Sequence, residues 1–155
     1  MADYDLLREQ ASSIIETEPH YVAALSNIAA LIYESMEQLN WAGFYLMDRG
    51  SLLVGPFQGK TACTVIEAGK GVCGTAAAED RTQLVPDVHE FPGHIACDSA
   101  SRSELVVPLH RKGELYGVLD IDSPSKGRFT ESDREVIEGF THTLEAALDR
   151  LKTDR

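Results

Sequence analysis

The sequence predicts an α+β domain in which N- and C-terminal helices pack on one side of a central antiparallel sheet. Apolar residues recur at helical spacing near both ends of the 155-residue chain, and they alternate with a period of two in much of the region between. Short turns such as "RKG" join successive strand patterns, which only antiparallel strands permit. The length suits one domain and no linker divides the chain, so we expect a single domain over residues 1–155.

Two helices are expected over residues 3–38, with a break in "TEPH", where Pro19 ends the first apolar run. The apolar positions expected to face the core are Leu7, Ala11, Ile14, Ile15, Val22, Leu25, Ile28, Ile32 and Met36.

From Trp41 the apolar period changes to two. "WAGFYLMD" and "SLLVGPF" predict a hairpin that turns at Arg49 and Gly50. "TACTVI" predicts a short third strand, "GKGVCGTAAAED" a short helix and "TQLVPDV" a brief strand. Residues 86–103 have no regular apolar period, and we expect this long loop to be the functional segment because structureless insertions are uncommon without a task.

The strands "ELVVPLH" and "ELYGVLDID" follow, and "FTESD" opens the last helix with Thr130 as its N-cap. The complete order of elements is therefore ααβββαβββα. The apolar face of the last helix is expected to contain Val136, Phe140, Leu144, Ala147 and Leu151. The terminal helices could also pair with a second copy of the chain, so a homodimer is a further expectation.

Composition excludes several classes of partner. The formal net charge is −11, and no stripe of Lys and Arg interrupts this negative field, so we expect no nucleic-acid partner. No run approaches the roughly 18 apolar residues that span a bilayer, so we expect no membrane partner. The N-terminus "MADYDLLREQ" lacks the basic start and apolar core of a secretion signal, which favours a cytoplasmic location.

The three cysteines are Cys63, Cys73 and Cys97, an odd count that disfavours a fixed disulfide framework in a reducing compartment. Cys63 and Cys73 lie beside glycine-bearing segments, so they could either pack as small core residues or reach an oxidised sulfur. Zinc is a rival use of these sulfurs together with His94. However, nine residues separate Cys63 from Cys73, whereas structural zinc sites use tight knuckles, so we expect no metal.

Cys97 lies in "GHIACDSASRSE", among small and polar residues that suit a loop, which favours chemistry over packing. His94 and Arg102 would increase its thiolate fraction, whereas Asp98 would decrease it. The sign of the net effect stays open at this level.

Three carboxylates are expected to converge near one end of the sheet. The period of two places Tyr116, Val118, Asp120 and Asp122 on one strand face, with the two aspartates roughly 7 Å apart. Glu104 begins the neighbouring antiparallel strand. Clustered acids repel, so a cationic ligand would stabilise them, and a carboxyl left protonated could act as a general acid. The alternative is structural: Asp122 caps the turn "DSPSKG" and Glu104 is solvated.

Trp41 starts a strand whose same face includes Gly43 and Tyr45. Most such tryptophans belong to the core, but beside acids the indole face could hold a cation or a sulfur-bearing methyl group. The serines of the long loop lack a G-x-S-x-G pattern, and "GKGVCG" is not a phosphate-binding Walker loop.

Five stretches of this chain closely resemble the free methionine-(R)-sulfoxide reductases, enzymes built on a GAF domain. They are "NWAGFYL", "GPFQGKTAC", "GKGVCGTAA", "VPDVHEFPGHIACDSASRSELVVPL" and "GVLDIDSP", and they run from about residue 40 to residue 129. The resemblance implies a single GAF-like domain and an oxidoreductase of oxidative-stress defence. It would reduce free L-methionine (R)-sulfoxide to L-methionine without a cofactor and be recycled by thioredoxin.

The resemblance also implies a role for each cysteine. Cys97 would be the thiolate that attacks the sulfoxide sulfur, and Cys63 the resolving thiol that forms a disulfide with it. Cys73 would be an accessory or alternative participant. Loss of methionine would leave a sulfenic acid on Cys97, which condenses with a nearby thiol.

The substrate-binding residues implied by the resemblance are Trp41, Glu104, Asp120 and Asp122. Trp41 would pack against the methylthio group, and the three acids would bind the ammonium group or help to protonate the sulfoxide oxygen. The alternative function is a non-catalytic GAF module that senses a small molecule. Such a module has no need for three cysteines around one loop.

Overall fold

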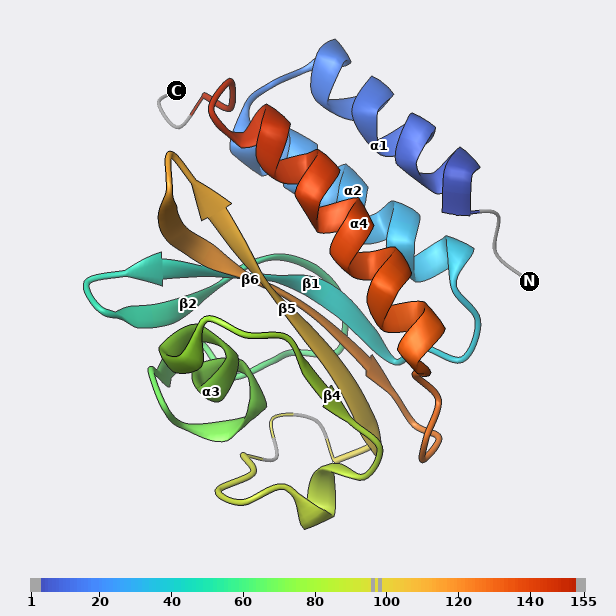
Figure 1. Cartoon of the computed structure of the whole chain (residues 1–155), viewed down its shortest axis with the longest axis vertical. Coiled ribbons are helices and arrows are strands. Elements are labelled where there is room, and N and C mark those ends of the chain that lie inside the picture. Colours follow the sequence, from blue (N-terminus) through green and yellow to red (C-terminus); the bar gives the residue numbers. More distant parts are fainter. Residues whose placement is uncertain (1–3, 96, 98, 153–155) are drawn as a thin grey trace.

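Six strands form one antiparallel sheet in the part of the chain that the structure describes, residues 4–95, 97 and 99–152 of a computed structural model. The strands are β1 (Trp41–Asp48), β2 (Ser51–Gly59), β3 (Val65–Glu67), β4 (Gln83–Val85), β5 (Ser103–Arg111) and β6 (Glu114–Ser123). Their spatial order is β3-β2-β1-β6-β5-β4, so β1 and β6 lie at the centre and β5 pairs with β6 (Figure 1). The predicted hairpin of β1 and β2 is confirmed, and it turns at Arg49 and Gly50.

The terminal helices α1 (Tyr4–Thr17), α2 (Tyr21–Ser35) and α4 (Glu131–Leu148) lie on one side of the sheet, and α3 (Gly71–Glu79) lies on the other (Figure 1). The predicted α+β class, with N- and C-terminal helices on one side, is confirmed. None of the helices in the described residues is long and apolar enough to cross a membrane.

Strand alternation divides the interior into two cores. Residues such as Phe44, Leu105 and Leu119 face the terminal helices. Tyr45, Val106 and Val118 face the opposite way and pack with α3. Because α3 is short, it covers only part of its face, and a site can form beside it.

Two helical faces differ from the prediction. Val22 is 47 % exposed, whereas Ala24 and Leu25 are buried, because α2 begins at Tyr21 and its first turn points outward. In α4, Ile137 is buried in place of Val136, since Ile137 lies three residues before Phe140 on the same face. Leu151 is buried but lies beyond the end of α4. The predicted Thr130 N-cap is confirmed: its Oγ1 accepts from the Asp133 N–H at 3.1 Å, and the Asp133 carboxylate accepts from the Thr130 N–H.

The predicted position of Tyr116 is wrong. The register of β5 and β6 shifts, with Leu109 opposite Gly117 but His110 opposite Leu115, so Tyr116 is an extra residue in β6. This bulge turns Tyr116 toward the helical core. Gly117 is required next to it, because a Cβ there would collide with the Tyr45 carbonyl oxygen of β1.

The third strand is shorter than predicted. Of "TACTVI", only Val65 and Ile66 belong to β3, and residues 61–64, which include Cys63, are irregular. The long loop contains one 3-10 turn, Val88–Glu90, and is otherwise irregular where it is described, as predicted.

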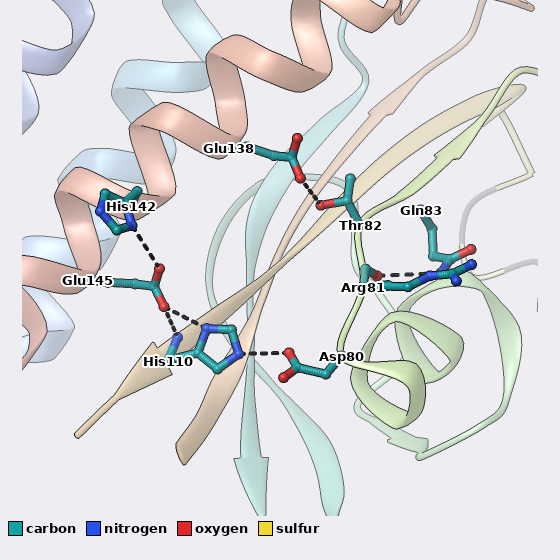
Figure 2. Close-up of polar contacts among 8 residues, drawn as sticks. All are labelled: Asp80, Arg81, Thr82, Gln83, His110, Glu138, His142 and Glu145. Atoms are coloured by element: carbon teal, nitrogen blue, oxygen red, sulfur yellow. Dashed lines mark hydrogen bonds and ion pairs between the residues drawn. The ribbon is translucent and has the colours of Figure 1, made fainter. Parts of the chain in front are cut away.

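A cluster of polar side chains links the C-terminal end of α3 to α4 through His110 of β5 (Figure 2). His110 of β5 contacts Asp80 through Nε2 at 2.7 Å and Glu145 through Nδ1 at 2.6 Å. The Glu145 carboxylate also accepts the His110 backbone N–H at 2.7 Å. These contacts fix one end of α3, and the other end lies at the site described next.

Candidate active site

A cavity lies between the sheet and α3, and irregular segments on either side complete its wall. It is lined by Trp41, Tyr45, Ala62, Ile66, Lys70, Gly71, Val72, Cys73, His94, Ile95, Cys97, Ser101, Glu104, Asp120 and Asp122. Six of the seven predicted site residues line this cavity. The seventh, Cys63, is bonded to Cys97.

The three acids converge because of strand register. Asp122 lies opposite Trp41 on one side and opposite Glu104 on the other, so these three residues form a row across β1, β6 and β5. Asp120 follows two residues earlier on the same face of β6. All three carboxyls are buried, so the alternative of a solvated Glu104 is wrong.

These carboxyls are short of partners. One oxygen of Asp120 and one of Asp122 are buried without a hydrogen bond, and no ion pair joins the three acids to a cation among the described residues. Ser101 donates to Asp122 at 3.4 Å. Burial, followed by the charge of the neighbouring acids, raises the pKa of both Asp120 and Asp122 well above the ordinary value. The cavity is therefore suited to a ligand that brings positive charge or hydrogen-bond donors.

Cys73 lies in the first turn of α3, directly beside the acids. Its side chain is buried, and its thiol donates to Glu104 at 3.8 Å. Burial, followed by the charges of Asp120 and Glu104, raises the pKa of this thiol. Cys73 is consequently held as a neutral thiol while the cavity contains no cation.

Cys63 and Cys97 form a disulfide, with their Cα atoms 5.2 Å apart. Both are half-buried, and the bond joins the segment before β3 to the long loop. His94 lines the same cavity, whereas Arg102 is exposed and does not. Asp98, expected to oppose ionisation of Cys97, lies outside the described residues.

Two aromatic side chains position the Cys63 segment. The Trp41 indole N–H donates to the carbonyl of Lys60 at 3.2 Å, and the Tyr45 hydroxyl donates to the carbonyl of Cys63 at 2.9 Å. Gly59 allows this close approach, since its φ is +131° and a Cβ would meet the Trp41 ring at 2.7 Å. Trp41 thus has both a structural contact and a face toward the cavity.

Several contributors to this wall were not predicted as site residues. The period of two placed Tyr45 on the same strand face as Trp41, but Tyr45 was given no role in the site. Ser101 links Asn40 to Asp122, a contact that no local pattern indicates. Lys70, Gly71 and Val72, at the start of α3, also line the cavity, and "GKG" before an alanine-rich stretch was the available signal.

Comparison with known proteins agrees with this architecture. A family model described as "GAF domain" matches residues 22–149. The chain is 48 % identical to the free methionine-R-sulfoxide reductase of Escherichia coli, with 94 % of this chain and 88 % of that protein covered. The chain belongs to the free methionine-(R)-sulfoxide reductase family of GAF domains.

Solved structures of this family have the same fold. The fRMsr of Staphylococcus aureus in complex with substrate superposes with a TM-score of 0.90 at 50 % identity, covering 96 % of this chain and 97 % of that chain. The free methionine-R-sulfoxide reductase of Neisseria meningitidis in complex with its substrate gives a TM-score of 0.90 at 42 % identity, covering 95 % and 90 %. The family and the fold that the sequence motifs implied are thereby confirmed.

Proposed function

We propose that this protein reduces free L-methionine (R)-sulfoxide to L-methionine, with Cys97 as the nucleophile and Cys63 as the resolving thiol. The observation that carries the proposal is one juxtaposition. Cys97 lies on the wall of a cavity that also contains three buried acids and Trp41, and it is within bonding distance of Cys63.

The cavity offers a complementary surface to each part of the amino acid. Glu104, Asp120 and Asp122 would receive the ammonium group, which supplies the positive charge that they lack. The backbone N–H groups at the start of α3 suit the substrate carboxylate, because the first N–H groups of a helix have no partner within the helix. The indole of Trp41 suits the methylthio group.

This arrangement explains selection of the free amino acid. Methionine within a peptide has no ammonium group and would leave the buried acids without a cation. A site built around buried polar groups rejects a ligand that leaves them unpaired. Reduction of peptide-bound methionine sulfoxide is therefore expected to be slow.

The reaction requires a thiolate and a proton donor on the same S=O bond. Cys97 attacks the sulfoxide sulfur, a carboxyl donates a proton to the oxygen, and the oxygen passes to the cysteine as methionine leaves. The raised pKa of Asp120 and Asp122 favours the protonated form of these carboxyls, which is the form that can donate this proton. Cys97 is left as a sulfenic acid, which condenses with the Cys63 thiol to a disulfide and water.

Thioredoxin is the proposed reductant. Its dithiol would attack the Cys63–Cys97 disulfide and leave both cysteines as thiols, while thioredoxin itself becomes oxidised. Both bonded cysteines are half-buried rather than sealed, which supports access by a protein thiol. Cys73 is only 4 % exposed, which supports an accessory role in place of that of nucleophile or resolving thiol.

The test uses reduced protein and racemic free L-methionine sulfoxide with thioredoxin, thioredoxin reductase and NADPH. We expect consumption of the (R) epimer alone, with one NADPH oxidised for each methionine formed. A matched peptide substrate should react far more slowly. Saturable binding without methionine formation would instead support a sensor module, and consumption of both epimers would refute the proposed stereochemistry.

A further inference from the structure

The cavity contains a set of side chains that fits a soft divalent cation. Cys73, Glu104 and Asp120 each present one potential ligand atom, all within 4.8 Å of one another, and all three residues are buried. The Cys73 sulfur and Glu104 Oε2 are 3.8 Å apart. In a tetrahedral zinc site, sulfur and oxygen ligands lie about 3.5 Å apart, so only a small inward movement is needed.

The acids of this set also have unpartnered oxygens, which is a second observation that fits a cation. Asp120 and Asp122 are only 5 % and 8 % exposed, and each has one buried oxygen without a hydrogen-bond partner. Native proteins rarely leave such atoms unsatisfied unless a ligand, water or ion completes them. Substrate ammonium is one such ligand, and a metal ion is another.

We propose that Cys73, Glu104 and Asp120 form an inhibitory site for Zn²⁺ or a similarly thiophilic cation, which competes with the amino-acid substrate for the same acids. The thiol selects the type of metal. Thiolate and carboxylate together suit Zn²⁺, whereas Mg²⁺ and Ca²⁺ prefer sites made of oxygen alone. Cys73 must lose its proton to bind, so binding releases at least one proton and strengthens as the pH rises.

This metal site differs from the zinc site rejected in the sequence analysis. That alternative required Cys63 and Cys97, whose sulfurs are joined to each other in the structure. The proposed site uses Cys73, a free thiol, and needs no change in the disulfide. The competition with substrate rests on the proposed function, but the metal binding itself does not.

Zn²⁺ binding is measured on the oxidised protein, in which the Cys63–Cys97 disulfide leaves only Cys73 able to supply a thiolate. Competition with a chromogenic zinc chelator gives the stoichiometry and affinity without any turnover. We expect one Zn²⁺ per chain. Titration with Cd²⁺ should produce a thiolate-to-cadmium charge-transfer band in the ultraviolet.

Two variants of the site and one control define the ligands. Cys73→Ser should abolish the cadmium band and lower the affinity for Zn²⁺ by more than about 100-fold. Loss even of a residue that only hydrogen-bonds to a metal ligand lowers metal affinity by about 10–100-fold. Asp120→Asn should lower the affinity for Zn²⁺ while the Cys73 thiol is retained. Asp80→Asn is the control, since Asp80 belongs to the His110 cluster at the other end of α3 (Figure 2).

Unchanged Zn²⁺ affinity in both site variants would overturn the proposal, as would loss of binding in Asp80→Asn. Free methionine sulfoxide should displace Zn²⁺ from the wild-type protein, and a failure to do so would refute the competition. A protein that binds Zn²⁺ in this way but forms no methionine would refute the proposed function and leave the metal site supported.

Discussion

Asp120→Asn tests whether the buried acids of the cavity serve substrate binding while they lower the free energy of unfolding. Asp120 is buried beside Asp122 and Glu104, and burial followed by their charges raises the pKa of its carboxyl. The folded chain therefore holds a proton that the unfolded chain releases above about pH 4. The stability supplied by this proton is complete below the unfolded-state pKa and is lost as the pH rises toward the folded-state pKa.

Asparagine does not ionise, so the variant escapes this loss. Wild type loses on the order of 1 kcal/mol of unfolding free energy for each pH unit in that window. For a chain of this size, this corresponds to about 2–4 °C in melting temperature. We expect Asp120→Asn and wild type to melt together near about pH 4 and the variant to melt progressively higher toward neutral pH. Scanning calorimetry at stepped pH measures the difference.

The same variant should lose activity while it gains stability. A hydrogen bond to a charged group contributes about 1.5–3 kcal/mol, so loss of the Asp120 carboxylate should lower kcat/KM by roughly 10- to 150-fold. A difference in melting temperature that stays flat with pH, or a variant less stable than wild type at neutral pH, would refute the reasoning.

Asp87→Asn is a control of opposite sign. The backbone N–H of His89, with help from Lys126, lowers the pKa of the Asp87 carboxyl despite slight desolvation. Its stabilisation is present above the unfolded-state pKa and is lost as the pH falls. We expect this variant to melt below wild type at neutral pH, with a difference that shrinks in acid.

Three further outcomes follow from the structure. Cys97→Ser should form no methionine even in a single turnover, whereas Cys63→Ser should form one equivalent and stop; product from Cys97→Ser would refute the assignment of the nucleophile. Gly117→Ala should lose about 1–3 kcal/mol of unfolding free energy in denaturant titrations, because its Cβ meets the Tyr45 carbonyl; wild-type stability would contradict this. Burial lowers the pKa of His110, but its contacts with two carboxylates have a larger effect and raise that pKa. The protonated His110 therefore stabilises the fold at low pH, and His110→Gln should lower the melting temperature more at about pH 6 than at about pH 9. The decrease should be no more than a few degrees. Equal effects at both pH values would count against that ion-pair cluster.

The sequence predicted the convergence of the acids because strand alternation and antiparallel pairing are local rules. A period of two places Asp120 and Asp122 on one face, and a short turn places Glu104 on the next strand. The same rules failed at Tyr116, where a bulge adds one residue and reverses the face. Bulges depend on contacts with the neighbouring strand, here the close approach of Gly117 to β1, which no local pattern contains.

The irregular segments were the least predictable part of the site. Ser101, in a loop without periodicity, donates a hydrogen bond to Asp122. Tyr45 donates one to the carbonyl of Cys63, which lies 18 residues away in the sequence. These contacts depend on how the loops fold over the sheet, which composition does not encode. The family motifs indicated that Cys63 and Cys97 would pair, but physical reasoning from the residues alone left the use of each sulfur open.

The most direct test is a single turnover of the fully reduced chain with free L-methionine (R)-sulfoxide, without external reductant and with the products analysed by mass spectrometry. We expect one methionine per chain, a loss of two hydrogen atoms from the protein and a peptide that links Cys63 to Cys97. Methionine formation accompanied by a different disulfide, or by none, would contradict the proposed chemistry.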